Sequence, residues 1–284
     1  MATRNQIKEY WNKQARLQRP GIKKIRIVNE KHDYFIGFSG QGGTLKDPRL
    51  RDIEIETLIE HLPRKGRLLD AGCGNGYTTT ELLRKIPKLN AVGVDYADEM
   101  IRGASKRVAR LKGISGRAQF MTGDMTDLGS MFDCGEFDII VTVRSLMNLE
   151  SWQAQKKAIS QLARALRQGG LFLMMEGSLQ ARGCLNKLRS AIGLPPFLGV
   201  WHNLYLDEKK LLPFLSRYFV IEEVISYSST YLFLTRCVLH TLRSPKKRWN
   251  YSHPMFRLAR QLPNEGQCGF HRLFRLRRKK TKKI

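Results

Sequence analysis

The feature that most constrains the fold of this chain is a glycine-rich turn between an apolar run and a helical segment. Residues 67–77 read Arg-Leu-Leu-Asp-Ala-Gly-Cys-Gly-Asn-Gly-Tyr, with glycines at the alternate positions 72, 74 and 76. Glycine has no Cβ atom, so the backbone can turn sharply there and approach a ligand closely. The N–H groups at the start of the following helix then face that ligand. The segment therefore predicts a binding turn at the end of a buried strand.

Apolar runs and segments of helical periodicity alternate on both sides of this turn. The runs, which have the composition of strands buried on both faces, lie at 67–71, 91–94, 118–121, 137–143 and 171–175. The helical segments lie at 52–62, 77–86, 97–112, 151–168, 179–191 and 207–216. Strands that alternate with helices predict an α/β fold with a parallel sheet. Two further β-rich runs, 218–227 and 230–239, predict a closing antiparallel hairpin.

The remaining segments divide the chain into a core and two flanks. Residues 1–50 are expected to form a helical cover and a Gly-rich loop at 37–43, which is either a lid or a flexible connection. Residues 51–240 form the expected core, with an inserted cover at about 178–217. Residues 241–284 are interpreted as a basic C-terminal extension.

The formal net charge of +25 is concentrated at the ends of the chain. Residues 236–284 hold 15 basic groups and 1 acidic group, whereas residues 51–235 are nearly balanced, with 24 and 20. The run 272–283, with 8 basic residues in 12 positions, is typical of a solvated segment. Contact of this tail with RNA or with an anionic membrane surface stays open.

The composition also indicates the cellular compartment of the protein and the redox state of its cysteines. Aliphatic stretches such as 171–175 fall far short of the roughly 20 residues that a membrane-spanning helix needs. The charged N-terminus has no apolar signal core. Five cysteines lie far apart without a C-x-x-C pair, which favours reduced thiols over a disulfide framework or a zinc site. We therefore expect a cytoplasmic protein without a metal site, at most peripheral to a membrane.

Acidic residues follow three consecutive predicted strands. Asp70, Asp95 and Asp124 stand where these strands end. The carboxyl ends of parallel strands meet at one edge of an open sheet, where such folds bind ligands, so we expect the three carboxylates to line one pocket. A carboxylate just before the glycine turn suits a cationic ligand, and one at the end of the next strand can accept hydrogen bonds from ribose hydroxyls. Simple N-capping by each acid is the structural alternative.

With these motifs, the chain resembles the class I S-adenosylmethionine-dependent methyltransferases, of the type that acts on small molecules. The resemblance covers about residues 50–240 and is carried by D-x-G-x-G-x-G from Asp70, by Asp95, by Gly123-Asp124, by Phe137-Asp-Ile-Ile-Val141 and by Leu166-Arg-Gln-Gly-Gly170. It implies a Rossmann-like fold with a mostly parallel seven-stranded sheet and a terminal antiparallel hairpin. It also implies methyl transfer with S-adenosyl-L-methionine as the cofactor.

The resemblance assigns individual residues to that cofactor. The methionine end falls to Asp70 and the backbone of Gly72 and Gly74, the ribose to Asp95, and the adenine to Asp124, the Met125 backbone and the Tyr96 side chain, with Arg144 as a further contact. Members usually carry proline where Gln168 stands, and this difference affects only a turn.

Candidates for the acceptor side follow the fourth and fifth strands. Arg144 suits an anionic or hydroxyl-rich acceptor, unless a nearby acid such as Glu150 saturates its guanidinium. Glu176 ends the fifth strand and is either a base or the group that holds Arg144. His202 is the best single candidate for a catalytic base because its ordinary pKa lies near neutral pH, and a structural histidine is the alternative.

These features predict methyl transfer to a polar small molecule, at an oxygen of a sugar-like or lipid-linked metabolite. Tyr10 and Trp11 either close over the cofactor or simply pack their helix. Two alternatives remain: an RNA methyltransferase that uses the basic ends, and a binding module that keeps the fold without catalysis. No separate RNA-binding module is visible in the sequence, and no Asn/Asp-Pro-Pro-Tyr/Phe signature follows the fourth strand.

Overall fold

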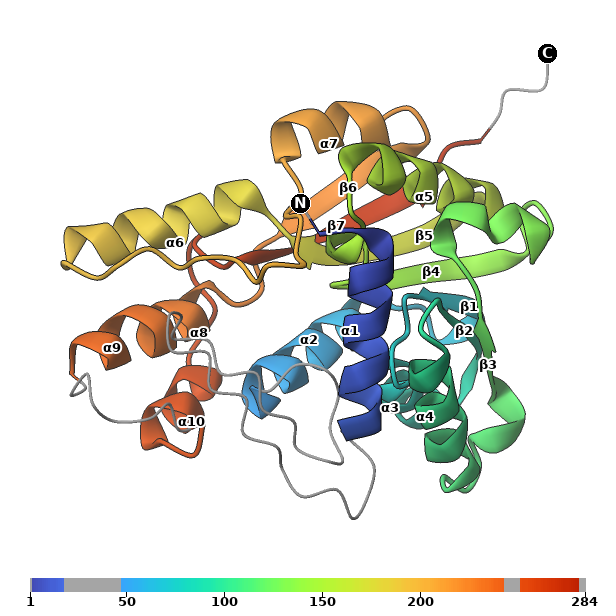
Figure 1. The fold of residues 1–284 in the computed structure, drawn as a ribbon, viewed down its shortest axis with the longest axis horizontal. Helices are drawn as coiled ribbons and strands as arrows, with labels where there is room; N and C mark the ends of the chain where they lie inside the picture. The colour runs from blue at the N-terminus through green and yellow to red at the C-terminus, as the bar shows by residue number, and fades with distance from the viewer. Residues whose placement is uncertain (1, 18–46, 243–250, 281–284) are drawn as a thin grey trace.

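A seven-stranded sheet organises the molecule, and helices cover both of its faces (Figure 1). The computed structural model describes residues 2–17, 47–242 and 251–280. The strands are β1 (Lys65–Ala71), β2 (Lys88–Asp95), β3 (Ala118–Thr122), β4 (Phe137–Val143), β5 (Leu166–Gly177), β6 (Phe219–Ile225) and β7 (His271–Arg278), in the spatial order β3-β2-β1-β4-β5-β7-β6. Strands β1 to β5 pair in parallel, and β7 is antiparallel to both of its neighbours. The expected α/β architecture is confirmed.

The described helices, most of which pack in three hydrophobic clusters, lie around the sheet. They are α1 (Arg4–Leu17), α2 (Pro48–His61), α3 (Tyr77–Lys85), α4 (Asp98–Ala109), α5 (Trp152–Ala165), α6 (Leu179–Ala191), α7 (Glu208–Leu215), α8 (Ser229–Phe233), α9 (Leu239–Thr241) and α10 (Pro254–Gln261), with 3-10 turns at Ser115–Arg117, Met125–Ser130 and Leu146–Asn148. One core joins α5 and α7 to one face of the sheet, and a second core joins α2, α3 and α4 to the other face. Successive strand residues alternate between the cores: Leu69 packs in the first and Leu68 in the second.

The partner of β6 differs from the one the sequence predicts. The run 230–239 is not a strand: it folds as α8, a π-helical turn (Leu234–Val238) and the start of α9. Most of the buried residues of this stretch recur at helical spacing; the buried residues are Tyr231, Leu232, Thr235, Arg236, Cys237 and Leu239. A short apolar run fits a buried helix as well as a strand, and here tertiary packing selects the helix.

The antiparallel neighbour of β6 is instead β7, which comes from the basic run assigned to a solvated tail. Leu273, Phe274 and Leu276 are fully buried between β5 and β6. Two arginines of β7, Arg275 and Arg277, pair with Glu222 on β6. Residues 271–278 therefore belong to the sheet, and the expected boundary at 240/241 is wrong. The Gly-rich loop 37–43 and residues 281–283 lie outside the described residues.

The expectation of reduced thiols is also wrong for one pair of cysteines. Cys184 on α6 and Cys268, just before β7, form a disulfide with a Cα–Cα distance of 5.0 Å. The two cysteines are 84 residues apart in the sequence, so the sequence alone does not indicate that the fold brings them together. Within the described part of the chain, none of the helices has the length and apolar character that crossing a membrane requires.

Candidate functional site

The glycine turn after β1 is held between two other segments of the sheet edge. Gly72, Gly74 and Gly76 have φ values of +79°, +54° and +70°, a region that favours glycine. The backbone N–H groups of Gly72 and Cys73 donate to the carbonyl of Val94 at 2.7 and 3.0 Å. A Cβ atom on Gly72 would lie 2.3 Å from the Cβ atom of Ser145. Steric contact as well as conformation therefore requires glycine at position 72.

Two carboxylates are buried beside this turn. Asp70 accepts a hydrogen bond from the Thr79 hydroxyl at 2.6 Å, and Asp95 accepts from the N–H groups of Gly74 (2.9 Å) and Ala97 (2.9 Å). Burial raises the pKa of Asp70 to about 7 and the pKa of Asp95 to about 6. The structure thus brings together both predicted acids and the turn, in a place where a positively charged ligand would stabilise their ionised forms.

The third predicted acid, Asp124, has a partner that the sequence does not reveal. Arg4 of α1 forms an ion pair with its carboxylate, which also accepts from the N–H group of Thr126 at 2.8 Å. Met125 lies beside the turn, with its Cε atom 3.0 Å from the position of a Cβ atom on Gly72. The hydroxyl of Tyr96 is buried without a hydrogen-bond partner among the described residues.

Helix α1 is attached to the start of α4 by two ion pairs and a hydrogen bond. Lys8 pairs with Asp98 at 3.4 Å, and Arg16 pairs with Glu99 at 3.4 Å. The side-chain oxygen of Asn12 accepts from the N–H group of Glu99 at 3.0 Å. The expected cover therefore lies across the start of α4, and its position in Figure 1 agrees with these contacts.

Arg144 follows β4 and is paired with Glu54 of α2, not with Glu150. Its φ of +54° is rare for a residue with a side chain and is typical of functional sites. Its Nε atom lies 3.1 Å from the Glu54 carboxylate, which is also 3.4 Å from the Tyr227 hydroxyl and 3.6 Å from Nδ1 of His271. Arg144 retains 18% side-chain exposure, and among the described residues no hydrogen bond or further ion pair involves its Nη groups.

Burial sets the protonation of this Glu54 cluster. It raises the pKa of Glu54 and lowers the pKa of His271 well below its ordinary value, so His271 is neutral. No local pattern in the sequence distinguishes Glu54, Tyr227 or His271 from ordinary helix and strand residues. Their convergence depends on α2, β6 and β7 meeting at one edge of the sheet.

Glu176 lies at the end of β5 and binds the backbone that follows Arg144. Its carboxylate accepts from the N–H groups of Ser145 (3.1 Å), Leu146 (3.0 Å) and Met147 (3.2 Å). The side chain is fully buried, and burial raises its pKa. Glu176 therefore stabilises the turn after Arg144 by binding its backbone. No hydrogen bond or ion pair between Glu176 and the Arg144 guanidinium is found in the described part of the chain.

His202 is enclosed by aromatic rings. Its ring centroid lies 4.5 Å from that of Tyr10, 5.4 Å from that of Trp11 and 5.1 Å from that of Trp201. Burial lowers the pKa of His202 to about 4, so the expected titration near neutral pH is wrong. The described residues provide no contact that joins His202 to Arg144 or Glu176.

The central part of the chain is similar to known proteins. Residues 68–170 match the family model of the methyltransferase domain. A 2-methyl-6-phytyl-1,4-hydroquinone methyltransferase of Oryza sativa is 31% identical over 150 residues, which are 53% of this chain and 38% of that protein. A demethylmenaquinone methyltransferase of Roseiflexus castenholzii is 35% identical over 114 residues, 40% of this chain and 44% of that protein. The chain thus spans about two fifths of the length of these relatives.

A solved structure extends the likeness of the fold to the whole chain. The geranyl diphosphate C-methyltransferase of Streptomyces coelicolor A3(2), in complex with Mg²⁺, geranyl diphosphate and S-adenosyl-L-homocysteine, superposes with a TM-score of 0.59 and 17% identity. The superposition covers 99% of each chain. At this identity the likeness concerns the fold alone.

Proposed function

We propose that this chain, which carries a class I S-adenosylmethionine-dependent methyltransferase domain, transfers the methyl group of S-adenosylmethionine to a polar small molecule. The observation that carries the proposal is the pair of buried carboxylates, Asp70 and Asp95, beside a turn of three left-handed glycines. Relatives named for a hydroquinone and a menaquinone support a small-molecule acceptor.

The residues present fit this cofactor. Its amino and sulfonium groups are cationic, and two desolvated carboxylates with raised pKa values are stabilised by such charges. Asp70 and the backbone of Gly72 and Gly74 would hold the methionine end. Asp95 would accept from the ribose hydroxyls.

The adenine of the cofactor would be bound by residues that lie close to α1. Asp124 would accept from the amino group while still paired with Arg4. Met125 and Tyr96 would flank the ring, and a polar ligand atom would satisfy the buried Tyr96 hydroxyl.

Arg144 is the proposed anchor of the acceptor. Glu54 holds its Nε edge, which leaves the Nη groups to bind an oxygen of the acceptor. The turn of Arg144 touches the cofactor turn, because the Ser145 hydroxyl donates to the carbonyl of Ala71 at 2.8 Å. An oxygen bound there would lie on the methionine side of the cofactor, as transfer to a sugar-like or lipid-linked metabolite requires.

The bound cofactor supplies an activated methyl group, so the protein mainly aligns the acceptor oxygen and excludes water. The hydroxyl proton leaves when the O–CH₃ bond forms. His202, with a pKa of about 4, is a weak destination for it at neutral pH, and the three backbone bonds of Glu176 favour a structural carboxylate. Methylation makes the acceptor oxygen acidic enough to release its proton to the solvent, so the proposal needs no side-chain base, and His202 and Glu176 are retained as groups that shape the site.

The RNA alternative has less support. This alternative rests on the basic ends of the chain, but at the C-terminal end Arg275 and Arg277 pair with Glu222, and Arg272 pairs with Glu208. These arginines contribute to the sheet and not to a free basic arm.

Calorimetry with S-adenosylhomocysteine and a transfer assay test the proposal together. We expect binding to the wild-type protein and a loss of about 2 kcal/mol or more in Asp95→Ala, because ribose contacts disappear. The matched control is Asp127→Ala, which removes an exposed carboxylate of the neighbouring turn and should leave the affinity unchanged.

The transfer assay uses methyl-labelled cofactor and a cell extract divided into soluble, lipid and RNA pools. Label in the soluble or lipid pool is the expected result. Label confined to RNA would contradict the proposed acceptor class, and absence of S-adenosylhomocysteine binding would contradict the proposed cofactor.

A further inference from the structure

Residues 191–201 form a segment that has no polar or charged side chain and is nevertheless exposed at several positions. They read Ala-Ile-Gly-Leu-Pro-Pro-Phe-Leu-Gly-Val-Trp and lead from the last residue of α6 to His202. Ile192, Leu198 and Trp201 are 44%, 49% and 55% exposed, and they are three of the nine large apolar side chains that are exposed in the described part of the chain. A group of exposed apolar side chains in one segment is typical of a surface that binds a partner.

This apolar segment is held in place by α6 and by the residues before β7. Phe197 is buried, and its ring stacks on that of Phe270, with 4.6 Å between centroids and 18° between planes. The side chain of Asn186 accepts from the N–H group of Phe197 at 2.7 Å and donates to its carbonyl at 3.3 Å. Arg189 donates from Nε to the carbonyl of Pro195 at 2.8 Å. The exposed apolar side chains therefore belong to a segment with fixed backbone contacts.

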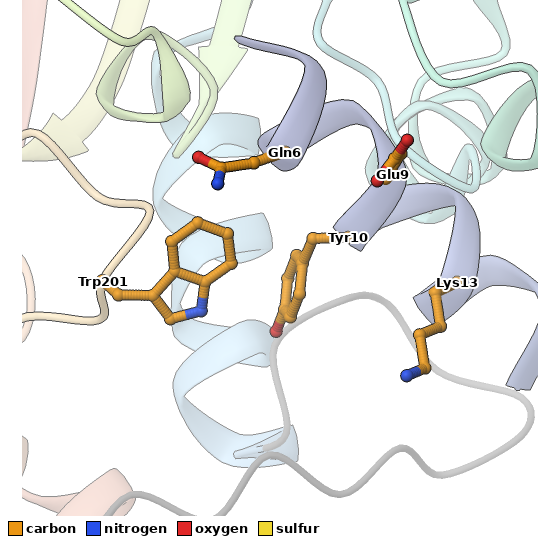
Figure 2. Close-up of a pocket in the computed structure, with 5 residues that line it drawn as sticks. All are labelled: Gln6, Glu9, Tyr10, Lys13 and Trp201. Carbon is orange, nitrogen blue, oxygen red and sulfur yellow. The ribbon is translucent and has the colours of Figure 1, made fainter. Parts of the chain in front are cut away.

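The end of the apolar segment lies beside the acceptor side of the candidate site. The Trp201 ring meets the ring of Tyr10 on α1 edge to face, with 5.5 Å between centroids (Figure 2). A pocket of about 360 Å³ at this junction is lined by Gln6, Glu9, Tyr10, Lys13 and Trp201. Three residues further on, Leu204 donates to the carbonyl of Met147 at 2.6 Å, in the turn that follows Arg144. The segment thus joins the α1 cover to the turn of the proposed acceptor anchor.

The surroundings of the apolar segment are basic. From Gly177 to Leu206 the sequence contains three basic residues, Arg182, Lys187 and Arg189, and no acidic residue. Arg189 is buried, whereas Lys187 is exposed on α6. This part of the chain therefore offers apolar contacts together with positive charge, and an anionic partner with an apolar interior matches both properties.

A lipid bilayer with anionic headgroups is such a partner. Apolar side chains of peripheral proteins enter the boundary between headgroups and acyl chains, tryptophan is favoured at that level, and nearby lysines are attracted by anionic lipids. A second copy of this chain is a poorer match, because two molecules that each carry a formal charge of +25 repel one another. Nucleic acid is also a poorer match, since Ile192 and Leu198 offer nothing to phosphates.

We propose that the apolar segment docks on the surface of a bilayer that contains anionic lipids, with Ile192, Leu198 and Trp201 at the acyl boundary and Lys187 among the headgroups. The acceptor side of the candidate site then lies close to the bilayer, so that a lipid-linked acceptor reaches it directly. This consequence rests on the proposed methyltransferase function, whereas the docking itself does not.

Co-sedimentation of the full chain with vesicles of equal parts phosphatidylcholine and phosphatidylglycerol tests the docking. We expect the wild-type protein to bind, and Leu198→Glu to weaken binding about tenfold, because an apolar contact is lost and a carboxylate is repelled. Val220→Glu is the matched control: Val220 is 52% exposed on β6, and the substitution changes the net charge equally. It should change binding by less than about twofold.

The electrostatic part of the docking is tested with Lys187→Gln. This substitution should weaken binding to the anionic vesicles about fivefold and leave the weaker binding to pure phosphatidylcholine vesicles unchanged. Lys209→Gln, at an exposed position of α7, is the matched control and should bind the anionic vesicles within about twofold of the wild-type protein.

Three outcomes would overturn the proposal: no vesicle binding by the wild-type protein, equal losses in Leu198→Glu and Val220→Glu, or equal losses in the two lysine variants. A wild-type dimer that Leu198→Glu converts to a monomer in sedimentation velocity, without vesicle binding, would assign the surface to a second copy and would also overturn it.

S-adenosylhomocysteine is titrated into the same proteins to separate this proposal from the proposed function. Leu198→Glu should bind it like the wild-type protein, which also shows that the variant is folded. Cofactor binding without vesicle binding would reject the docking and leave the proposed function standing. Vesicle binding without cofactor binding would reject the proposed function and leave the docking.

Discussion

Asp70 and Asp95 link the candidate cofactor site to pH. Their native pKa values of about 7 and 6 exceed the ordinary value of 3.8, so the folded protein holds protons that the unfolded chain releases. These two groups therefore make the free energy of unfolding of the ligand-free protein fall as pH rises from about 4 to 7. A cationic ligand favours the ionised carboxylates and so acts in the opposite direction.

The affinity for S-adenosylmethionine should therefore increase as pH rises from 5.5 to 7.5, with protons released on binding. Calorimetry in two buffers of different ionisation enthalpy measures both the affinity and the number of protons. Asp95→Asn should reduce proton release on binding as well as affinity. An affinity that stays constant or falls over this range would argue against a cation beside these carboxylates.

Glu176 yields a prediction about stability. In Glu176→Gln, one carboxylate oxygen is replaced by an amide N–H₂ group, so the N–H groups of Ser145 to Met147 cannot all keep their acceptors. We expect the free energy of unfolding to fall by about 1–3 kcal/mol in urea denaturation. Glu223→Gln on β6, at an exposed position, should change it by less than about 0.5 kcal/mol. Equal effects of the two substitutions would show that the Glu176 contacts contribute nothing.

At the scale of elements, α1 is a cover attached mainly by charge. Its pairs with Asp124, Asp98 and Glu99 are partly exposed, and such pairs contribute about 0.2–1 kcal/mol each and are screened by salt. Among its apolar side chains, Ile7 is fully buried, so an apolar contact remains when the charges are screened. This combination makes α1 the element of the site that ionic strength should loosen most.

Raising the salt concentration from 0.05 to 0.5 M should increase amide hydrogen exchange in residues 4–17 several-fold. Helix α5 is the internal control, because its buried apolar face is not sensitive to screening. Arg4→Ala should produce part of the same increase at low salt. Exchange in α1 that does not respond to salt would mean that apolar packing alone holds the cover.

At the scale of the whole molecule, β7 decides whether the sheet exists. Each of its three buried apolar side chains, Leu273, Phe274 and Leu276, contributes about 1.5–3 kcal/mol on burial, and the strand also supplies two ladders of hydrogen bonds. The total is comparable to the 5–15 kcal/mol that typically stabilises a whole protein.

Truncation after Phe270 should therefore abolish cooperative thermal unfolding, as followed by circular dichroism. Truncation after Lys280 removes only residues outside the described part of the chain and should leave the melting temperature close to that of the full chain. A cooperative transition in the shorter truncation would show that β7 is dispensable.

The sequence was sufficient to predict the elements that have local signatures. The glycine turn, β1 to β5 and the three strand-end acids follow from periodicity and from residue types that only certain backbones tolerate. The role of β7 was not predicted, because its four arginines indicate a solvated segment until Glu222 and Glu208 are placed beside three of them. The partners of Arg144 and Asp124 were missed for the same reason: Glu54 and Arg4 lie far away in sequence and become neighbours only through tertiary packing.

The position of β7 has a consequence for the order of events during synthesis. Among the described strands, β7 comes last in chain order, yet it must insert between two strands that are made earlier, β5 and β6. Until then both of those strands present open backbone edges, which are templates for intermolecular pairing. The nascent protein therefore remains vulnerable to aggregation until β7 has left the ribosome and inserted into the sheet, and a bulky fusion placed directly after β7 should prolong that vulnerable period.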